Sequence, residues 1–363
     1  MYLIPHRVNI PEIVPFYKTF RLACQNRKKY NEADRPHQAM QEGEYMIKKR
    51  LSGQVLAVIL ALSVCGCGVS GSKAAGSSQA QKASSSARAS TGAPASSSES
   101  TSKANGTSAN PIAKMEKIRS SIIANKDYYM SLSDDNPNTW SFKRMKDHTV
   151  SGSYETFKIS DYNSCYADLN VTDKDKVIYL TFDCGYPSDL TVKILDTLKA
   201  HNAKATFFVT KMYLEGCGDY ARRMKAEGHA VCNHTVHHED LRGKSVEKVV
   251  SEIIDAAEYF YEITGYEFDP YFRTPTGAYT KRLLSIARDC GYKTVFWSIA
   301  YGDYDVNNQP APGYVLNHFT TYHHNGAIAL MHNASTSNVK ELDAVLTMLE
   351  KNGYRFALLN ELD

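Results

Sequence analysis

Two histidines in this chain have a spacing that is typical of metal ligands. His234 and His238 are four residues apart, so one helical turn would place both imidazoles on the same face, where both can reach one ion. Threonine follows His234, which excludes the His-Glu-x-x-His pattern of zinc proteases. The spacing alone also fits two ordinary, partly exposed histidines.

Asp183 is the candidate general base. It closes an apolar, β-rich run and could take a proton from a metal-bound water; the alternative is an aspartate that caps a helix. Arg273 could keep Asp183 ionised through a two-point ion pair. The alternative for Arg273 is a surface charge, although the sequence Pro-x-Gly close behind it favours a rigid loop.

His332 is the candidate proton donor. It directly follows the apolar residues Leu330 and Met331, a position from which an imidazole could protonate a leaving amine. The alternative is a core histidine with satisfied hydrogen bonds. Its role therefore depends on whether the fold brings it to the same place as Asp183.

The segments around these residues alternate between short β-rich runs and runs of helical period. This alternation predicts parallel strands, and seven candidate strands favour an α/β barrel over a doubly wound sheet. We expect strands at residues 177–183, 205–210, 230–233, 271–273, 294–298, 327–331 and 355–358, and helices at 189–200, 220–227, 246–264, 281–290, 314–323 and 339–351.

The candidate residues occur where these strands end. In parallel α/β folds the reactive groups gather at the carboxyl ends of the strands. Asp183, Arg273 and His332 end predicted strands, and His234, His238 and Asp303 follow others. The sequence therefore predicts a single pocket mouth for all of them.

Six motifs carry a resemblance to a known family. They are Thr181-Phe182-Asp183, His234-Thr235-x-x-His238, Arg273-x-Pro275, Trp297-Ser298-Ile299-Ala300 with Asp303-Tyr304, Asn307-Asn308-Gln309 and Leu330-Met331-His332. With these motifs, the chain from about Trp140 to its end resembles the polysaccharide deacetylases with a NodB homology domain, carbohydrate esterase family four. Within that family it is most similar to the delta-lactam-biosynthetic (muramic acid) de-N-acetylases, and Trp140, Phe142 and Arg144 resemble the N-terminal extension of that subgroup.

The resemblance implies a distorted (β/α) barrel at residues 176–363, with an extension at 112–175 packed on it. The implied reaction is hydrolysis of the acetamide of an N-acetylated sugar. Asp183 would take a proton from water, His332 would protonate the amine, and Arg273, tethered by Asp303, would orient Asp183. His234 and His238 would hold a divalent metal, and the N–H of Thr276 and the side chain of Tyr304 would contact the oxyanion or substrate.

Cys184 departs from the family pattern. Relatives commonly carry there a second aspartate that binds the metal, and a thiolate in that position would favour zinc. The alternative is that Cys184 only packs. A second departure, Ala300 in place of an aspartate, matches the delta-lactam subgroup.

The expected substrate is peptidoglycan. N-acetylmuramic acid in strands without peptide is the first candidate, and its product would lie on the route to muramic δ-lactam, as in spore cortex. One alternative is an N-acetylglucosamine deacetylase of peptidoglycan or another glycan. The other is a glycan-binding module whose catalysis is impaired by Cys184.

The sequence of the first part of the chain indicates an export signal rather than a folded domain. Residues 46–67 resemble a signal peptide that ends like a bacterial lipobox, with Cys67 as the lipidated residue. An uncleaved membrane anchor is the alternative, and both place the domain outside the cytoplasm, at the outer leaflet of the membrane. We expect translation to start at Met46, which makes residues 1–45 a wrongly assigned extension.

Residues 68–111 predict a disordered linker. From Ser70 to Pro111 the chain has no Val, Ile, Leu, Met, Phe, Tyr or Trp, so nothing there offsets the entropy of ordering.

Residues 1–50 hold ten Lys and Arg against five Asp and Glu, and the remainder holds 32 basic and 34 acidic residues. That balance argues against a nucleic-acid partner.

Overall fold

The computed structural model describes residues 110–133, 138–172 and 174–362. The predictions for residues 1–45, for the signal peptide at 46–67 with Cys67, and for nearly all of the linker lie outside the described residues. Within the described ranges, no helix combines the length and the apolar character needed to cross a membrane.

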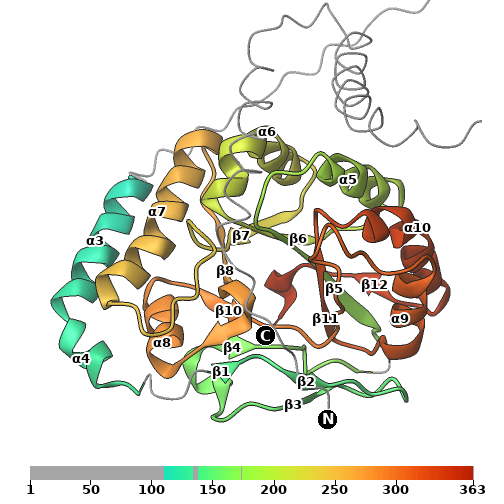
Figure 1. Cartoon of the computed structure of the whole chain (residues 1–363), viewed down its shortest axis with the longest axis horizontal. Coiled ribbons are helices and arrows are strands. Elements are labelled where there is room, and N and C mark those ends of the chain that lie inside the picture. Colours follow the sequence, from blue (N-terminus) through green and yellow to red (C-terminus); the bar gives the residue numbers. More distant parts are fainter. Residues whose placement is uncertain (1–109, 134–137, 173, 363) are drawn as a thin grey trace, which may run out of the picture. The chain divides into compact units, whose positions relative to one another are not determined.

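A curled sheet of eight parallel strands forms the centre of the fold (Figure 1). Its strands alternate in sequence with helices, as the β-rich runs predict. In spatial order they are β11 (Ala327–His332), β5 (Val177–Cys184), β6 (Thr206–Val209), β7 (Ala230–Asn233), β8 (Asp269–Phe272), β10 (Lys293–Val295) and β4 (Ser164–Cys165), and β12 (Arg355–Phe356) also pairs with β5.

The two ends of this sheet curl toward each other. Beyond β10, Ile299 forms a parallel bridge with Ala329 of β11, and beyond β4, Ala167 bridges Ala327. The sheet is thus an irregular, incompletely closed barrel, and the predicted distorted (β/α) barrel is confirmed. The closure brings the segment after β10 alongside β11, which matters for the site.

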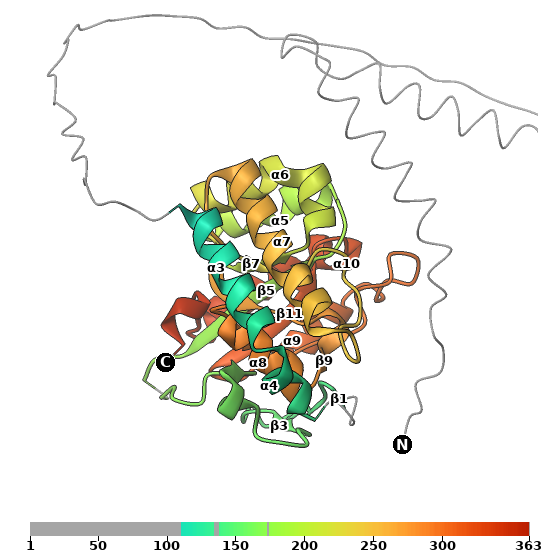
Figure 2. The same ribbon diagram turned by 90° about the vertical axis from the view of Figure 1, so that its left-hand side faces the viewer.

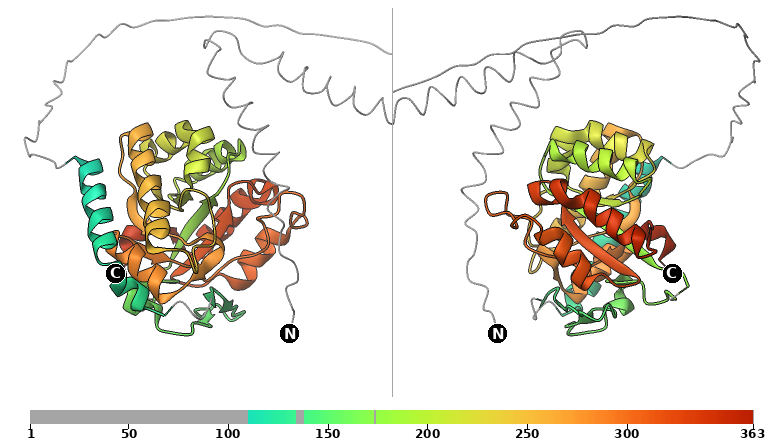
Figure 3. Two further views of the ribbon diagram at one scale, coloured as in Figure 1. Left: turned by 60° about the vertical axis from the view of Figure 1, so that its left-hand side comes forward. Right: turned by 90° about the vertical axis from the view of Figure 1, so that its right-hand side faces the viewer.

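Helices cover the outside of the sheet (Figures 1 and 3). Several begin at side-chain caps, among them Thr210, Ser245 and Ser335, each of which accepts a hydrogen bond from the backbone N–H three residues on. The helices are α5 (Leu190–Ala200), α6 (Lys211–Ala226), α7 (Val246–Thr264), α8 (Lys281–Asp289), α9 (Tyr314–Tyr322) and α10 (Thr336–Lys351).

Two helix boundaries differ from expectation. Helix α6 begins at Lys211, not at residue 220, because Thr210 caps it; the backbone at Cys217 is non-helical, which interrupts the helical pattern. Helix α10 begins at Thr336 because Ser335 caps it.

Residues before the barrel pack on its side. Helix α3 (Pro111–Ala124) lies beside α7 (Figure 2), where Arg119 forms ion pairs with Asp255 and Glu258. The other elements before and around the barrel are α4 (Lys126–Ser131), which contacts α8, the antiparallel pairs β1 (Asn138–Thr139) with β9 (Ala278–Tyr279) and β2 (Phe142–Lys143) with β3 (Gly152–Ser153), and the 3₁₀ turns η3 (Ile159–Tyr162), η4 (Pro275–Gly277) and η5 (Leu359–Glu361).

Strand β5 separates two apolar layers. Its residues Leu180, Phe182 and Cys184 belong to the cluster that packs under the helices, whereas Val177 and Tyr179 belong to a second cluster. Successive side chains of a strand point to opposite faces. Asp183 therefore points to the face opposite Cys184.

Candidate active site

An ion pair lies at the end of β5. Asp183 Oδ1 accepts a hydrogen bond of 2.7 Å from Arg273 Nη1, and the guanidinium is fully buried. The expected ion pair is present, but the expected two-point geometry is wrong. Other donors of Arg273 are used elsewhere, since Nε donates to the Val295 carbonyl at 2.9 Å and Nη2 to the Phe296 carbonyl at 3.3 Å.

The surroundings of Asp183 favour its ionised form. Burial acts to raise the pKa of this carboxyl group, but the positive charge of Arg273 and the neighbouring His234 and His332 outweigh it, and the pKa lies below its usual value. An ionised carboxylate is the form that a general base needs.

His234 lies beside Asp183 with one ring nitrogen unused. Its Nδ1 is 2.8 Å from the Arg273 carbonyl oxygen, and because a carbonyl can only accept, Nδ1 carries the proton. Its Nε2 is buried, has no hydrogen-bond partner among the described residues, and lies 3.5 Å from Asp183 Oδ2. Burial also lowers the pKa of His234. A neutral imidazole with a free Nε2 lone pair fits a metal ligand.

His238 completes the pair of imidazoles. The ring centroids of His234 and His238 are 4.8 Å apart, so the structure brings the two together. The expected helical turn is wrong, however, because residues 234–238 form a loop in which Thr235 and His238 have positive φ angles of 73° and 56°. Burial lowers the pKa of His238 to about 3.

Cys184 does not join these groups. Its side chain is fully buried under the helices, and its Sγ lies 3.8 Å from the carbonyl oxygen of Phe182. Burial raises the pKa of its thiol well above the ordinary value. The structure contradicts the predicted ligand role of Cys184, because strand alternation turns it away from Asp183. The expectation of zinc depended on this thiolate and therefore loses its support.

His332 is held by Asp303. Its Nδ1 lies 2.7 Å from Asp303 Oδ1, and its backbone N–H donates to Asp303 Oδ2 at 2.8 Å. The expectation that Asp303 tethers Arg273 is wrong, because barrel closure places Asp303 against β11. Burial acts to lower the pKa of His332, but the charge of Asp303 outweighs it, and the pKa lies above its usual value. A raised pKa suits a proton donor near neutral pH.

Asn338 belongs to the same network and was not anticipated. Fully buried in α10, it donates from Nδ2 to Asp303 Oδ2 at 2.6 Å and accepts from the hydroxyl of Tyr301 at 2.8 Å. No motif in the sequence points to it. Asn338 is far from Asp303 in the sequence, so their contact cannot be recognised before the fold is known.

The two residues expected to contact substrate lie at the surface. Thr276 is exposed in η4, in a left-handed conformation with φ of 57°. Tyr304 is 69% exposed, and its ring centroid lies 6.1 Å from that of His332. Tyr304 therefore stands at the mouth of the site, where an aromatic face can meet a ligand.

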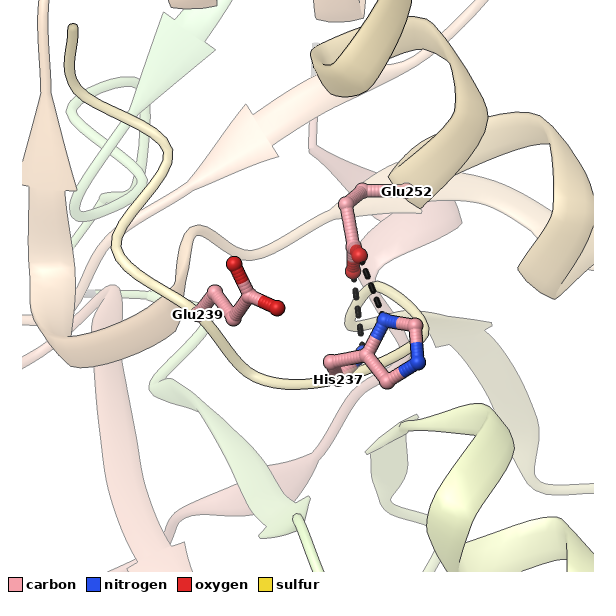
Figure 4. A group of neighbouring side chains, drawn as sticks. All are labelled: His237, Glu239 and Glu252. Carbon is pink, nitrogen blue, oxygen red and sulfur yellow. Dashed lines mark hydrogen bonds and ion pairs between the residues drawn. The ribbon is translucent and has the colours of Figure 1, made fainter. Parts of the chain in front are cut away.

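A second group of ligand-type atoms lies beside the histidine loop. Atoms of His237, Glu239 and Glu252 all lie within 4.8 Å of one another (Figure 4). However, Lys248 Nζ is already 2.6 Å from Glu252 Oε1 and 3.6 Å from Glu239 Oε1. Lys244 Nζ is also 3.3 Å from Glu239 Oε2. Two lysine cations thus pair with the two carboxylates, so the group is an ion-paired cluster.

The described residues also include a polar cavity of about 240 Å³, which is lined by Val177 at the start of β5, with Asp168, Asp175 and Arg355. Asp183 lies near the other end of the same strand. This cavity is therefore separate from the site described above.

Comparisons with known proteins point in one direction. A family model described as polysaccharide deacetylase matches residues 170–295. Over 228 residues the chain is 38% identical to the peptidoglycan-N-acetylmuramic acid deacetylase PdaA of Bacillus subtilis, a match that covers 62% of this chain and 86% of that protein. It is 31% identical over 201 residues to a peptidoglycan-N-acetylglucosamine deacetylase of Bacillus cereus, covering 54% of this chain and 92% of the other.

Solved structures agree. The structure of Bacillus subtilis PdaA, a family 4 carbohydrate esterase, matches with a TM-score of 0.59 at 37% identity and covers 64% of this chain and 98% of that one. A family 4 carbohydrate esterase from Bacillus anthracis matches with a TM-score of 0.51 at 31% identity, with coverage of 64% and 98%.

Proposed function

This chain belongs to the polysaccharide deacetylases of carbohydrate esterase family 4, and on that premise we propose that it removes N-acetyl groups from peptidoglycan, with N-acetylmuramic acid as the preferred sugar. The relative from Bacillus subtilis, named for that sugar, supports the preference. The observation that carries the proposal is the arrangement of Asp183 and His234, whose Oδ2 and Nε2 are 3.5 Å apart.

The proposed reaction uses two proton transfers. Asp183, kept ionised by Arg273, takes a proton from water as the water oxygen bonds to the acetyl carbon. The C–N bond then breaks, and His332, held by Asp303, gives a proton to the departing amine. The products are acetate and the free amino sugar.

His234 and His238 would hold a divalent metal. The free, buried Nε2 of His234 fits this role, and Cys184 takes no part in it. When bound there, such an ion would polarise the acetyl carbonyl and acidify a bound water. Asp183, whose Oδ2 lies 3.5 Å from His234 Nε2, would act as the base beside that ion.

The surface residues would bind the glycan. The N–H of Thr276 would stabilise the oxyanion, and the exposed ring of Tyr304 would pack against a sugar beside His332. The chain is proposed to act outside the cytoplasm, anchored to the outer leaflet through a lipid on Cys67. A product amine on muramic acid would lead to the muramic δ-lactam of a spore cortex.

One experiment distinguishes the proposed function from two alternatives. The purified protein, supplied in turn with zinc, manganese and cobalt, is incubated with peptide-free glycan strands, and the sugars are identified by mass spectrometry. We expect acetate together with deacetylated muramic acid. Deacetylated glucosamine alone would instead match the Bacillus cereus relative's name. Binding without acetate would indicate an impaired module, although the retained Asp183, Arg273 and His332 disfavour it.

A further inference from the structure

A buried carboxylate on α7 reaches the loop that carries both histidines. Glu252 is 1% exposed. Its Oε2 accepts hydrogen bonds from the backbone N–H groups of Val236 at 3.0 Å and His237 at 2.9 Å. Its Oε1 lies 2.6 Å from His237 Nδ1 (Figure 4). Oε1 also accepts a hydrogen bond from Lys248 Nζ at 2.6 Å. Every one of these contacts serves the loop or neutralises the charge.

The loop needs such restraint. Thr235 and His238 both have positive φ angles, a conformation that residues other than glycine avoid and that a β-branched residue such as threonine tolerates poorly. Within the loop, Asn233 Oδ1 accepts from the N–H of Thr235 at 2.9 Å, and Thr235 Oγ1 accepts from the N–H of His238 at 3.1 Å. Strained backbone of this kind persists only where several contacts hold it.

Glu252 ties the middle of the loop to a long helix. Val236 and His237 lie between the two imidazoles in sequence, so fixing their N–H groups fixes the backbone on both sides. Lys248, one helical turn earlier on α7, supplies the compensating positive charge. The negative charge of Glu252 is thus compensated within the protein.

We propose that Glu252 is a positioning residue that holds His234 and His238 in the orientation that binds a divalent metal. This inference rests on the proposed metal-dependent function. Glu252 would act through the loop, because its hydrogen bonds go to the backbone of Val236 and His237 and to the side chains of His237 and Lys248.

The test compares E252Q with E239Q. Glu239 belongs to the same cluster, but it is partly exposed and forms ion pairs with Lys244 and Lys248. Cobalt affinity is measured by calorimetry, and amide hydrogen exchange of residues 234–238 is measured without metal. We expect E252Q to bind cobalt about 10 to 100 times more weakly and to exchange faster in the loop, and E239Q to match the wild-type protein in both.

Each outcome bears on a different statement. Wild-type exchange and affinity in E252Q would overturn the positioning role. If the wild-type protein binds no cobalt, the metal part of the proposed function fails, while the exchange comparison still decides whether Glu252 orders the loop. If E252Q does not fold, E252D replaces it, because a side chain shorter by one methylene keeps the charge but withdraws from the amides. Wild-type behaviour of E252D would overturn the proposal.

Discussion

Replacing Arg273 by methionine tests the electrostatics of the site. The guanidinium is fully buried and Asp183 is 6% exposed, so R273M leaves a buried carboxylate without its partner. Removing one member of such a pair costs about 3–5 kcal/mol. This cost is a large part of the free energy of unfolding of a typical domain, which is roughly 5–15 kcal/mol. R273M should therefore unfold at a lower temperature and a lower urea concentration than the wild-type protein.

The double variant D183N/R273M separates the ion pair from its surroundings. With both charges removed, the loss should be smaller than the sum of the two single losses by about 1–3 kcal/mol, as for residues in direct contact. Urea unfolding of the four proteins, followed by circular dichroism, gives the required free energies. Losses that add to within about 0.5 kcal/mol would refute the coupling inferred from the 2.7 Å contact.

The pH dependence gives a second check on the same variant. The pKa of Asp183 lies below its ordinary value of 3.8 in the folded protein. Its ionised form therefore contributes stability that is present above that value and is lost as the pH falls through the folded pKa. The stability difference between wild type and R273M should narrow as the pH falls. The narrowing begins above about pH 4, because burial without Arg273 raises the pKa of Asp183 in the variant, and it continues through the folded pKa of the wild type. A difference that stays constant down to the acid transition would contradict this assignment.

Three further predictions concern individual residues. D303N removes the charge that raises the pKa of His332, so the basic limb of the kcat/KM profile should move to lower pH; an unmoved limb would show that His332 is not the titrating acid. C184S should leave the metal content, measured by mass spectrometry, unchanged, because the thiol packs under the helices; loss of metal would restore Cys184 as a ligand. Y304A should raise KM by about tenfold with little change in kcat, as expected for lost substrate packing of about 1–1.5 kcal/mol, and steady-state kinetics that show the reverse would place Tyr304 in the chemical step.

Some features of the fold could not be found by local patterns. Strand β4 has two residues, Ser164 and Cys165, and its pairing with Thr294 and Val295 joins distant parts of the chain. Helix α6 was expected to start later, because Gly216 and Gly218 flank the non-helical Cys217. In each case a tertiary contact or a cap, rather than periodicity, defines the element.

The candidate active site also contains one feature that the sequence pattern could predict and one that it could not. The position of Cys184 could have been inferred from strand alternation, since Phe182 and Cys184 must share a face when Asp183 points to the other. The contact of Asp303 with His332 could not have been inferred from the sequence. The two residues are 29 positions apart, and their contact depends on the bridge between Ile299 and Ala329.

The sequence by itself determined the alternation of strands and helices, the placing of the reactive residues at strand ends, and the family, because these follow from short-range periodicity and from motifs. Tertiary structure alone decided which groups meet. It assigned Asp303 to His332, joined Glu252 to the histidine loop and buried Asn338 in the network, because hydrogen bonds between distant segments form only after the sheet has curled and the helices have packed on it.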